Sequence, residues 1–131
     1  MKHEKKILIV DDADLAHKIY SVRFSSLNVS LLSARNGNEA IDMISKIHDI
    51  ALVILDMNMS SMSGLELLNA LPSRFKQKVP IIAVSSEHDK AKQQTALQNG
   101  AIRFFQKSDI LELKQFIEPL LWNLQPAAMK A

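Results

Sequence analysis

Short apolar runs alternate with stretches of helical periodicity along the whole chain. Buried strands of a parallel sheet read as continuous apolar runs, and helices connect one such strand to the next. The pattern therefore predicts an α/β fold in which helices cover both faces of a parallel sheet. The five predicted strands are Ile7–Val10, Val29–Ala34, Ile50–Leu55, Val79–Val84 and Ala101–Phe105.

Five helices are predicted between and after these strands. The third is short and ends at Pro72, because proline cannot continue a helix hydrogen-bond ladder. The fourth, residues 87–99, has Leu97 as its only large apolar side chain and ends at Gly100, so we expect it to be weakly anchored. Apolar residues at helical spacing mark one face of each of the others: Leu15, Ile19 and Val22; Ala40, Ile41, Ile44 and Ile47; Leu65, Leu68 and Leu71; and Ile110, Leu113, Ile117 and Leu121.

Composition and charge narrow the class of protein. The chain has 131 residues, of which 47% are hydrophobic and 23% charged, as in one ordinary globular domain. The absence of cysteine excludes disulfides, thiolate nucleophiles and cysteine-based metal sites. A net charge of +2 is too small for a nucleic-acid footprint, and the apolar runs are far shorter than the roughly 20 residues that span a bilayer. We expect a cytoplasmic protein that binds neither nucleic acid nor membrane.

Polar residues follow four of the predicted strands. Asp11 and Asp12 end the first, Asp56 the third, Ser85 the fourth and Lys107 follows the fifth. The carboxyl ends of parallel strands meet at one edge of a sheet, where ligands bind. Three neighbouring carboxylates repel one another unless a cation compensates, and an oxygen-only ligand set suits Mg²⁺.

This set of groups favours phosphoryl transfer. A carboxylate can act as a nucleophile toward phosphorus, and the reaction needs mainly positioning and positive charge around the phosphoryl oxygens. Mg²⁺ and Lys107 would supply the charge, and Ser85 a hydrogen bond. The polar residues at this edge of the sheet are therefore interpreted as an aspartyl-phosphate site.

The chain resembles the response-regulator receiver domains of two-component signalling over residues 5–123. The resemblance depends on the strand-end residues above, on Gly64 eight residues after Asp56, and on the run Gly100-Ala101…Phe104…Lys107. It implies a doubly wound sheet in the flavodoxin-like order 2-1-3-4-5 with five helices, a receiver domain over residues 1–124 and a disordered tail over residues 125–131, too short for an output module.

The resemblance also implies a role for each site residue. Asp56 would be the phosphoacceptor, Lys107 the phosphate-binding lysine, Ser85 the switch hydroxyl and Phe104 the switch aromatic. Mg²⁺ would be bound directly by Asp12 and Asp56, by the backbone carbonyl of Asn58, and by Asp11 largely through water. The protein would catalyse only its own phosphorylation and dephosphorylation.

Partners follow from the same resemblance. The phosphoryl group would come from a sensor histidine kinase or a histidine phosphotransfer protein. Its arrival would draw Ser85 inward, let Phe104 turn inward, and move the weakly anchored helix of residues 87–99. The face formed by that helix, the fifth strand and the last helix would then contact a downstream protein target or a second copy of the chain.

Two positions depart from the usual receiver pattern. Receivers usually have proline four residues after the phosphoacceptor, where this chain has Ser60, and Lys-Pro with a cis bond where it has Lys107-Ser108. A cis bond before a residue other than proline costs about 2.5–4 kcal/mol. We therefore predict either a trans Lys107–Ser108 bond or a strained cis one. Glu87, close to Ser85, is a candidate modifier of phosphate lifetime.

The sequence leaves three alternatives open. A degenerate receiver would act as a phosphorylation-independent interaction module, which Ser60 and Ser108 leave open. A haloacid-dehalogenase-like phosphatase would place a second acidic residue where this chain has Asn58. A flavodoxin-like flavin-binding module shares the strand order, but Asp11 and Asp12 would repel the flavin phosphate.

Overall fold

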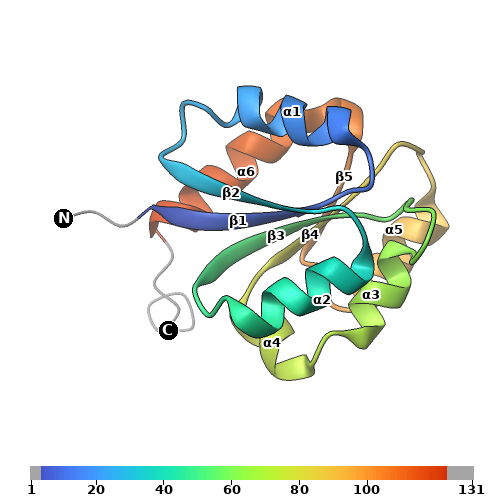
Figure 1. The fold of residues 1–131 in the computed structure, drawn as a ribbon. Coiled ribbons are helices and arrows are strands. Elements are labelled where there is room, and N and C mark those ends of the chain that lie inside the picture. The colour runs from blue at the N-terminus through green and yellow to red at the C-terminus, as the bar shows by residue number, and fades with distance from the viewer. Residues whose placement is uncertain (1–3, 124–131) are drawn as a thin grey trace.

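The computed structural model describes residues 4–123, which form a parallel five-stranded sheet with helices on both faces (Figure 1). The strand order is β2-β1-β3-β4-β5. This is the flavodoxin-like doubly wound topology, and the predicted fold class is confirmed. The predicted tail, residues 125–131, lies outside the described residues. The strands are β1 (Lys5–Val10), β2 (Val29–Ala34), β3 (Ile50–Asp56), β4 (Ile81–Ser85) and β5 (Arg103–Gln106).

The helices divide between the two faces of the sheet. Figure 1 shows α1 (Asp14–Arg23) and α6 (Ile110–Asn123) on one face, and α2 (Gly37–Lys46), α3 (Gly64–Ala70), α4 (Ser73–Lys78) and α5 (Lys90–Gln98) on the other. None of the helices within residues 4–123 is both long enough and apolar enough to cross a membrane.

The central strands alternate between two hydrophobic clusters. In β1, Leu8 and Val10 pack with α2 and α3, whereas Ile7 and Ile9 pack with α1 and α6. Successive side chains of a strand point to opposite faces, and both faces of this sheet are covered. This is why the strands appear in the sequence as unbroken apolar runs.

The first helix does not bury the predicted face. Leu15, Ile19 and Val22 are exposed to 67%, 42% and 71%. The buried side of α1 carries His17 and Tyr20 instead, and its C-cap residue Phe24 is also buried. Tyr20 and Phe24 have larger apolar side chains, their rings pack 5.4 Å apart, and the His17 ring is hydrogen-bonded in the interior. The exposed apolar stripe of α1 is thus a surface feature.

The described chain contains six α-helices rather than the five predicted, and a short 3-10 turn over Lys107–Asp109 precedes the last. The unpredicted helix is α4. Pro72 is the predicted end of the third helix, but it is also the N-cap of α4, with a φ of −62°. With six residues, α4 is too short to show a period. The next helix begins at Lys90 rather than residue 87, because the Asp89 side chain caps the amides of Ala91 and Lys92.

Candidate functional site

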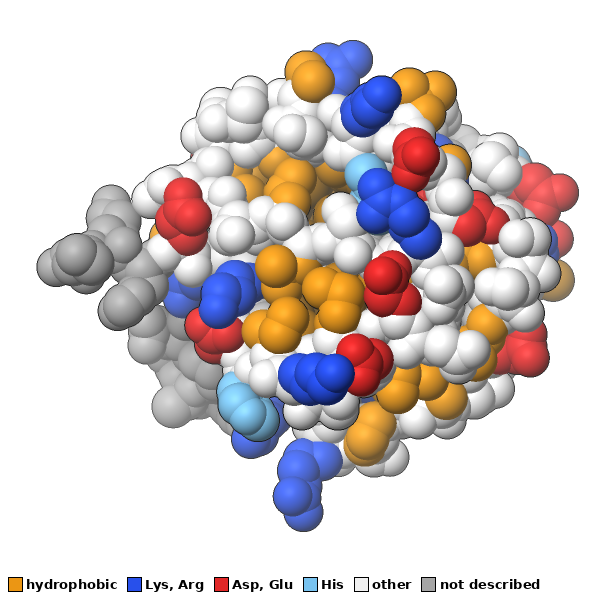
Figure 2. Space-filling model, viewed as in Figure 1, with side chains coloured by type: hydrophobic (Ala, Val, Ile, Leu, Met, Phe, Trp, Pro, Cys, Tyr) orange, Lys and Arg blue, Asp and Glu red, His pale blue; other side chains and the backbone are white. Residues whose placement is uncertain are grey.

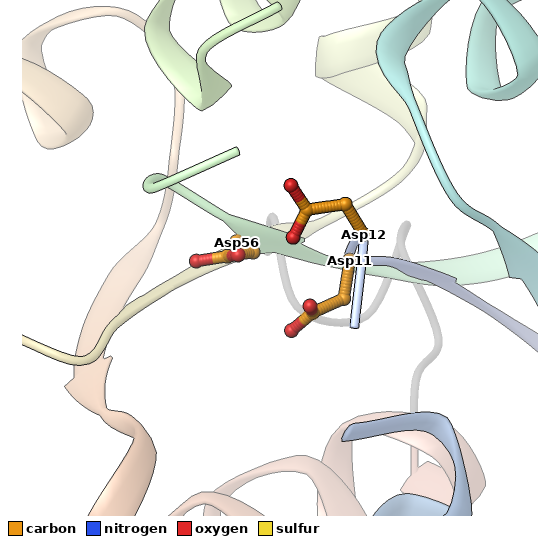
Figure 3. A group of neighbouring side chains, drawn as sticks. All are labelled: Asp11, Asp12 and Asp56. Atoms are coloured by element: carbon orange, nitrogen blue, oxygen red, sulfur yellow. The ribbon is translucent and has the colours of Figure 1, made fainter. Parts of the chain in front are cut away.

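Three carboxylates meet at the carboxyl edge of the sheet. β1 and β3 are adjacent, with Val10 opposite Leu55, so Asp11 and Asp12 after β1 lie beside Asp56 at the end of β3. One carboxylate oxygen of each residue lies within 4.8 Å of the others. Figure 3 shows the Asp11 and Asp12 side chains extending toward the side on which Asp56 lies. Asp11 and Asp56 are 1% and 2% exposed, whereas Asp12 is open to solvent.

Lys107 joins the two buried carboxylates. Its Nζ lies 2.7 Å from Asp11 Oδ2 and 3.4 Å from Asp56 Oδ2. Burial alone would lower the pKa of Lys107, but the hydrogen bond to Asp11 and the charges of Asp56 and Asp11 outweigh burial and raise that pKa above its usual value. Lys107 is therefore a fixed positive charge at neutral pH.

Asp56 is buried but keeps two polar partners. Its Oδ1 accepts a 3.0 Å hydrogen bond from the Asn58 amide, and Lys107 lies near Oδ2. Burial raises the pKa of Asp56, and the Asp11 charge raises it further, while the Asn58 amide and Lys107 act in the opposite direction. An added cation would favour the ionised carboxylate, which is the nucleophilic form.

Gly64 lets the loop after β3 fold closely over Asp56. A Cβ at this position would lie 2.6 Å from Met57 Cα and 2.7 Å from the Asp56 carbonyl oxygen. Any larger residue would push the start of α3 away from the strand end. Ser63 and Glu66 form a reciprocal capping box at this helix start, which fixes the loop at its far end.

Ser60 holds Asp12 in place. Its amide and hydroxyl donate hydrogen bonds of 2.9 and 3.1 Å to Asp12 Oδ2. The Ser60 amide is the main cause of a lowered pKa at Asp12, against the opposing effect of burial. Proline, the usual receiver residue at this position, has no N–H and could not make the first bond. The sequence marked Ser60 as a departure but not as a partner of Asp12.

The side chain of Asn58 joins the loops after β3 and β4. Its Oδ1 accepts a 2.6 Å hydrogen bond from the Ser85 hydroxyl and a 3.3 Å bond from the Ser86 amide. Its Nδ2 donates to Glu87 Oε1 over 3.2 Å, and Glu87 also pairs with Lys92 at 2.8 Å. The sequence predicts only a metal-binding role for the Asn58 backbone carbonyl and gives no sign of these side-chain contacts.

The two predicted switch residues lie on the adjacent strands β4 and β5. Ser85 is fully buried at the end of β4, and Phe104 is half-buried on β5, packed against the cluster that includes α5. All described peptide bonds are trans, so the trans alternative predicted for Lys107–Ser108 is the one adopted. His17 Nε2 donates a 2.7 Å hydrogen bond to the Asp11 carbonyl and thereby braces the strand end from α1.

The donor set fits a hard divalent cation. The site holds three carboxylates against one lysine, so it keeps excess negative charge. Asp11 Oδ2 is buried, and the Lys107 ammonium 2.7 Å away neutralises only one of the three carboxylates. Carboxylate and carbonyl oxygens are the ligands that Mg²⁺ prefers. The arrangement can hold such a cation next to an ionised, buried carboxylate.

Comparison with known proteins gives one consistent result. Residues 7–118 match the family described as the response regulator receiver domain. A chemotaxis protein CheY homolog of Campylobacter jejuni is 34% identical over 119 residues, which cover 88% of this chain and 92% of that protein. Chemotaxis protein CheY1 of Helicobacter pylori is 35% identical over 105 residues, or 78% of this chain and 84% of its own.

Solved structures share the fold. The receiver domain of Francisella response regulator 1452 superposes with a TM-score of 0.80 at 21% identity, covering 93% of this chain and all of that one. The receiver domain of Saccharomyces cerevisiae Ssk1, solved with the histidine phosphotransfer protein Ypd1, gives a TM-score of 0.78 at 22% identity, covering 90% and 89%.

Proposed function

The chain belongs to the response regulator receiver domain family, and from this premise we propose that it is a phosphorylation-dependent switch with Asp56 as its phosphoacceptor. The donor would be a phosphohistidine, on a sensor histidine kinase or a histidine phosphotransfer protein. The observation that carries the proposal is the position of Asp56: buried, at the strand end, beside Asp11, Asp12 and Lys107.

The residues have separate tasks in the transfer. An oxygen of the ionised Asp56 carboxylate attacks phosphorus, the bond between phosphorus and the histidine nitrogen breaks, and the donor ring, already protonated on its other nitrogen, leaves as neutral imidazole. Lys107, fixed between Asp11 and Asp56, balances charge on the phosphoryl oxygens. Mg²⁺ would be held by Asp11, Asp12, Asp56 and the Asn58 carbonyl, and would neutralise further negative charge there.

The switch would begin at Ser85. A phosphoryl group adds about −1.5 to −2 charges and strong acceptor oxygens, so the Ser85 hydroxyl would exchange Asn58 Oδ1 for a phosphoryl oxygen. Phe104 would then turn inward, and α5 would move. The only buried residue of α5 is Ala96, so this helix can move with little loss of packing.

Two surfaces are assigned to partners. A phosphohistidine must reach Asp56, so the protein that carries it must cover the carboxyl edge of the sheet. At this edge α1 begins, three residues after Asp11. The exposed Leu15, Ile19 and Val22 of α1 offer apolar contact there. The output face is proposed at α5, β5 and α6, where Leu97 and Ile102 are 40% and 42% exposed, for a downstream target or a homodimer.

Intact-mass measurement tests the proposal. Incubation with acetyl phosphate and Mg²⁺ should add one phosphoryl group to the wild-type chain and none to Asp56→Asn. Chelation of Mg²⁺ should also prevent the gain. If no gain occurs with acetyl phosphate, phosphoramidate or a phosphorylated histidine phosphotransfer protein, the chain is a degenerate receiver. Turnover of a phosphomonoester would instead indicate a phosphatase.

A further inference from the structure

An apolar groove lies between α2 and the segment from the end of α3 through α4. It has a volume of about 640 Å³, within the roughly 300–1,000 Å³ range of small-molecule sites. We propose that this groove binds a small amphiphile with an aliphatic chain and one carboxylate, such as a medium-chain fatty acid.

The groove is lined mainly by apolar side chains. Ile44 and Ile47 of the α2 segment face it from one side, and Phe75 and Val79 from the other. All four are half-buried and pack against the core on that face of the sheet, so each keeps some apolar surface in contact with water. Figure 2 shows groups of exposed hydrophobic side chains between charged ones on the side viewed in Figure 1. An aliphatic chain would cover such surface, with affinity rising by up to about fourfold per buried methylene.

The charges around the groove favour an anion. Arg74 and Lys78 are exposed, lie four residues apart on α4 and line the groove. Neither forms a salt bridge with another residue in the range 4–123, whereas the nearby Lys46 pairs with Asp42. No described lining residue is acidic. Two unpaired cations over an apolar floor complement one carboxylate on an aliphatic chain.

The groove is separate from the carboxylate site. Among its lining residues, Ile50 is the first residue of β3 and Val79 precedes β4, whereas Asp56 is the last residue of β3. The length of a seven-residue strand, about 20 Å, therefore separates the two. An occupant of the groove would not touch Asp56, and the inference does not depend on the proposed phosphorylation.

The test is an amide NMR titration of the full chain with decanoate, without Mg²⁺. We expect saturable shifts at Ile44, Ile47, Phe75 and Val79, with affinity increasing from hexanoate to octanoate to decanoate. The double variant Arg74→Gln/Lys78→Gln should bind decanoate about five- to tenfold more weakly, because it removes two cations and each exposed ion pair contributes up to about a factor of five. The matched control is Lys18→Gln, which removes an exposed charge from α1 on the opposite face and should leave the affinity unchanged.

Any of four results would overturn the proposal. One is equal affinity of the wild-type and double-variant chains for decanoate, and another is equal affinity for decanoate and the neutral 1-decanol. The third is a shift pattern centred on Leu15, Ile19 and Val22 of α1. Sedimentation velocity tests whether a second copy of the chain occupies the groove. A dimer that the double variant dissociates is the fourth result, and it would assign the groove to self-association instead. Ile44→Asn, if its thermal unfolding remains cooperative, should abolish the groove shifts.

Discussion

The hydroxyl of Ser85 donates a 2.6 Å hydrogen bond to Asn58 Oδ1, across the gap between the loops that follow β3 and β4. The same hydroxyl oxygen accepts a 3.1 Å bond from the Glu87 amide. Ser85 is fully buried, so its proton has Asn58 as its acceptor as long as Asp56 carries no phosphoryl group. Under the proposed mechanism, Asn58 would therefore compete with the phosphoryl group for the Ser85 hydroxyl.

Asn58→Ala should favour the activated state. It removes the acceptor but keeps the backbone carbonyl and the amide that bonds Asp56. A neutral hydrogen bond contributes about 0.5–1.5 kcal/mol, so we expect the concentration of the phosphoryl mimic beryllofluoride at half-saturation to fall by about two- to tenfold. NMR titration with Mg²⁺ present measures it.

The matched control for Asn58→Ala is Glu87→Gln. This change weakens the ion pair with Lys92 but leaves Ser85 bonded to Asn58. Its half-saturation should stay near the wild-type value. Equal shifts in both variants would assign the effect to the charge of the loop and contradict competition for Ser85.

The pair Ser60→Pro and Ser60→Ala should separate the two bonds to Asp12. The backbone amide is the main cause of the lowered pKa of Asp12, so Ser60→Pro should move that pKa back toward 3.8 or above, and Ser60→Ala should change it little. A carboxylate whose pKa is lowered in the folded state stabilises the fold at pH values above its pKa in the unfolded state. This stabilisation is lost as pH falls through its pKa in the folded state. Carboxyl NMR titration measures both variants; equal pKa values for Asp12 in them would refute the assignment.

Leu15→Lys/Val22→Lys should slow phosphotransfer from a protein but not from a small molecule. Both side chains are more than half exposed, so the fold should persist, while charges on the α1 stripe would oppose apolar docking. We expect labelling by a phosphorylated histidine phosphotransfer protein to slow by about tenfold or more, since each charge placed in an apolar contact costs at least about 1 kcal/mol. Labelling by acetyl phosphate should be unchanged.

The control is Leu111→Lys, at a 58% exposed position of α6. If this variant slows labelling by the phosphotransfer protein equally, α1 is not the docking surface.

The fold was predictable because each central strand is buried on both faces and therefore apolar throughout. The face of α1 was not predictable in the same way. Two sets of residues have helical spacing, Leu15, Ile19 and Val22 on one side and His17, Tyr20 and Phe24 on the other, and the first is more hydrophobic. The second is buried because the Tyr20 and Phe24 rings pack in the core and His17 has a carbonyl acceptor inside the protein. Periodicity cannot reveal that acceptor.

Part of the site was likewise predictable from the sequence, and part was not. The meeting of Asp11, Asp12, Asp56 and Lys107 followed from the rule that ligands bind at the carboxyl ends of parallel strands. The bonds from Ser85 to Asn58 and from Ser60 to Asp12 link residues 27 and 48 positions apart. They depend on how two loops face each other, and no local spacing in the sequence encodes that.

Asp56→Asn should stabilise the chain at neutral pH in the absence of Mg²⁺. The pKa of Asp56 is raised above its ordinary value of 3.8, so its contribution to stability is fully present below that value and is lost as pH rises through the folded pKa. The variant should therefore gain over wild type at pH 7 and lose this gain at pH 3. Urea unfolding at both pH values measures the difference; a gain of equal size at both would exclude ionisation of Asp56 as its source.

Mg²⁺ should stabilise the wild-type chain but not Asp12→Ala. A ligand at ten times its Kd adds about 1.4 kcal/mol to the free energy of unfolding, and the three carboxylates are the groups that fit the cation. Thermal unfolding with and without MgCl₂, at constant ionic strength, measures the effect. CaCl₂ and NaCl are the ionic controls, and equal Mg²⁺ stabilisation of the variant would remove Asp12 from the metal site.

Lys76 should be needed to hold α5 in place. Its Nζ donates 2.9 and 3.1 Å hydrogen bonds to the carbonyls of Leu68 in α3 and Asn99 at the end of α5, so one lysine of α4 joins the carboxyl ends of two helices, where the dipole favours a cation. Charged hydrogen bonds contribute about 1.5–3 kcal/mol when well made. We expect Lys76→Met to destabilise the chain by about 1–3 kcal/mol and to speed amide exchange in α5 more than in α1 or α6.

Lys46→Met, which removes only an exposed pair with Asp42, should cost less than about 0.5 kcal/mol. If amide exchange in α5 is no faster in Lys76→Met than in Lys46→Met, α5 is held by its own packing, and the proposed ease of its movement on phosphorylation would need another cause.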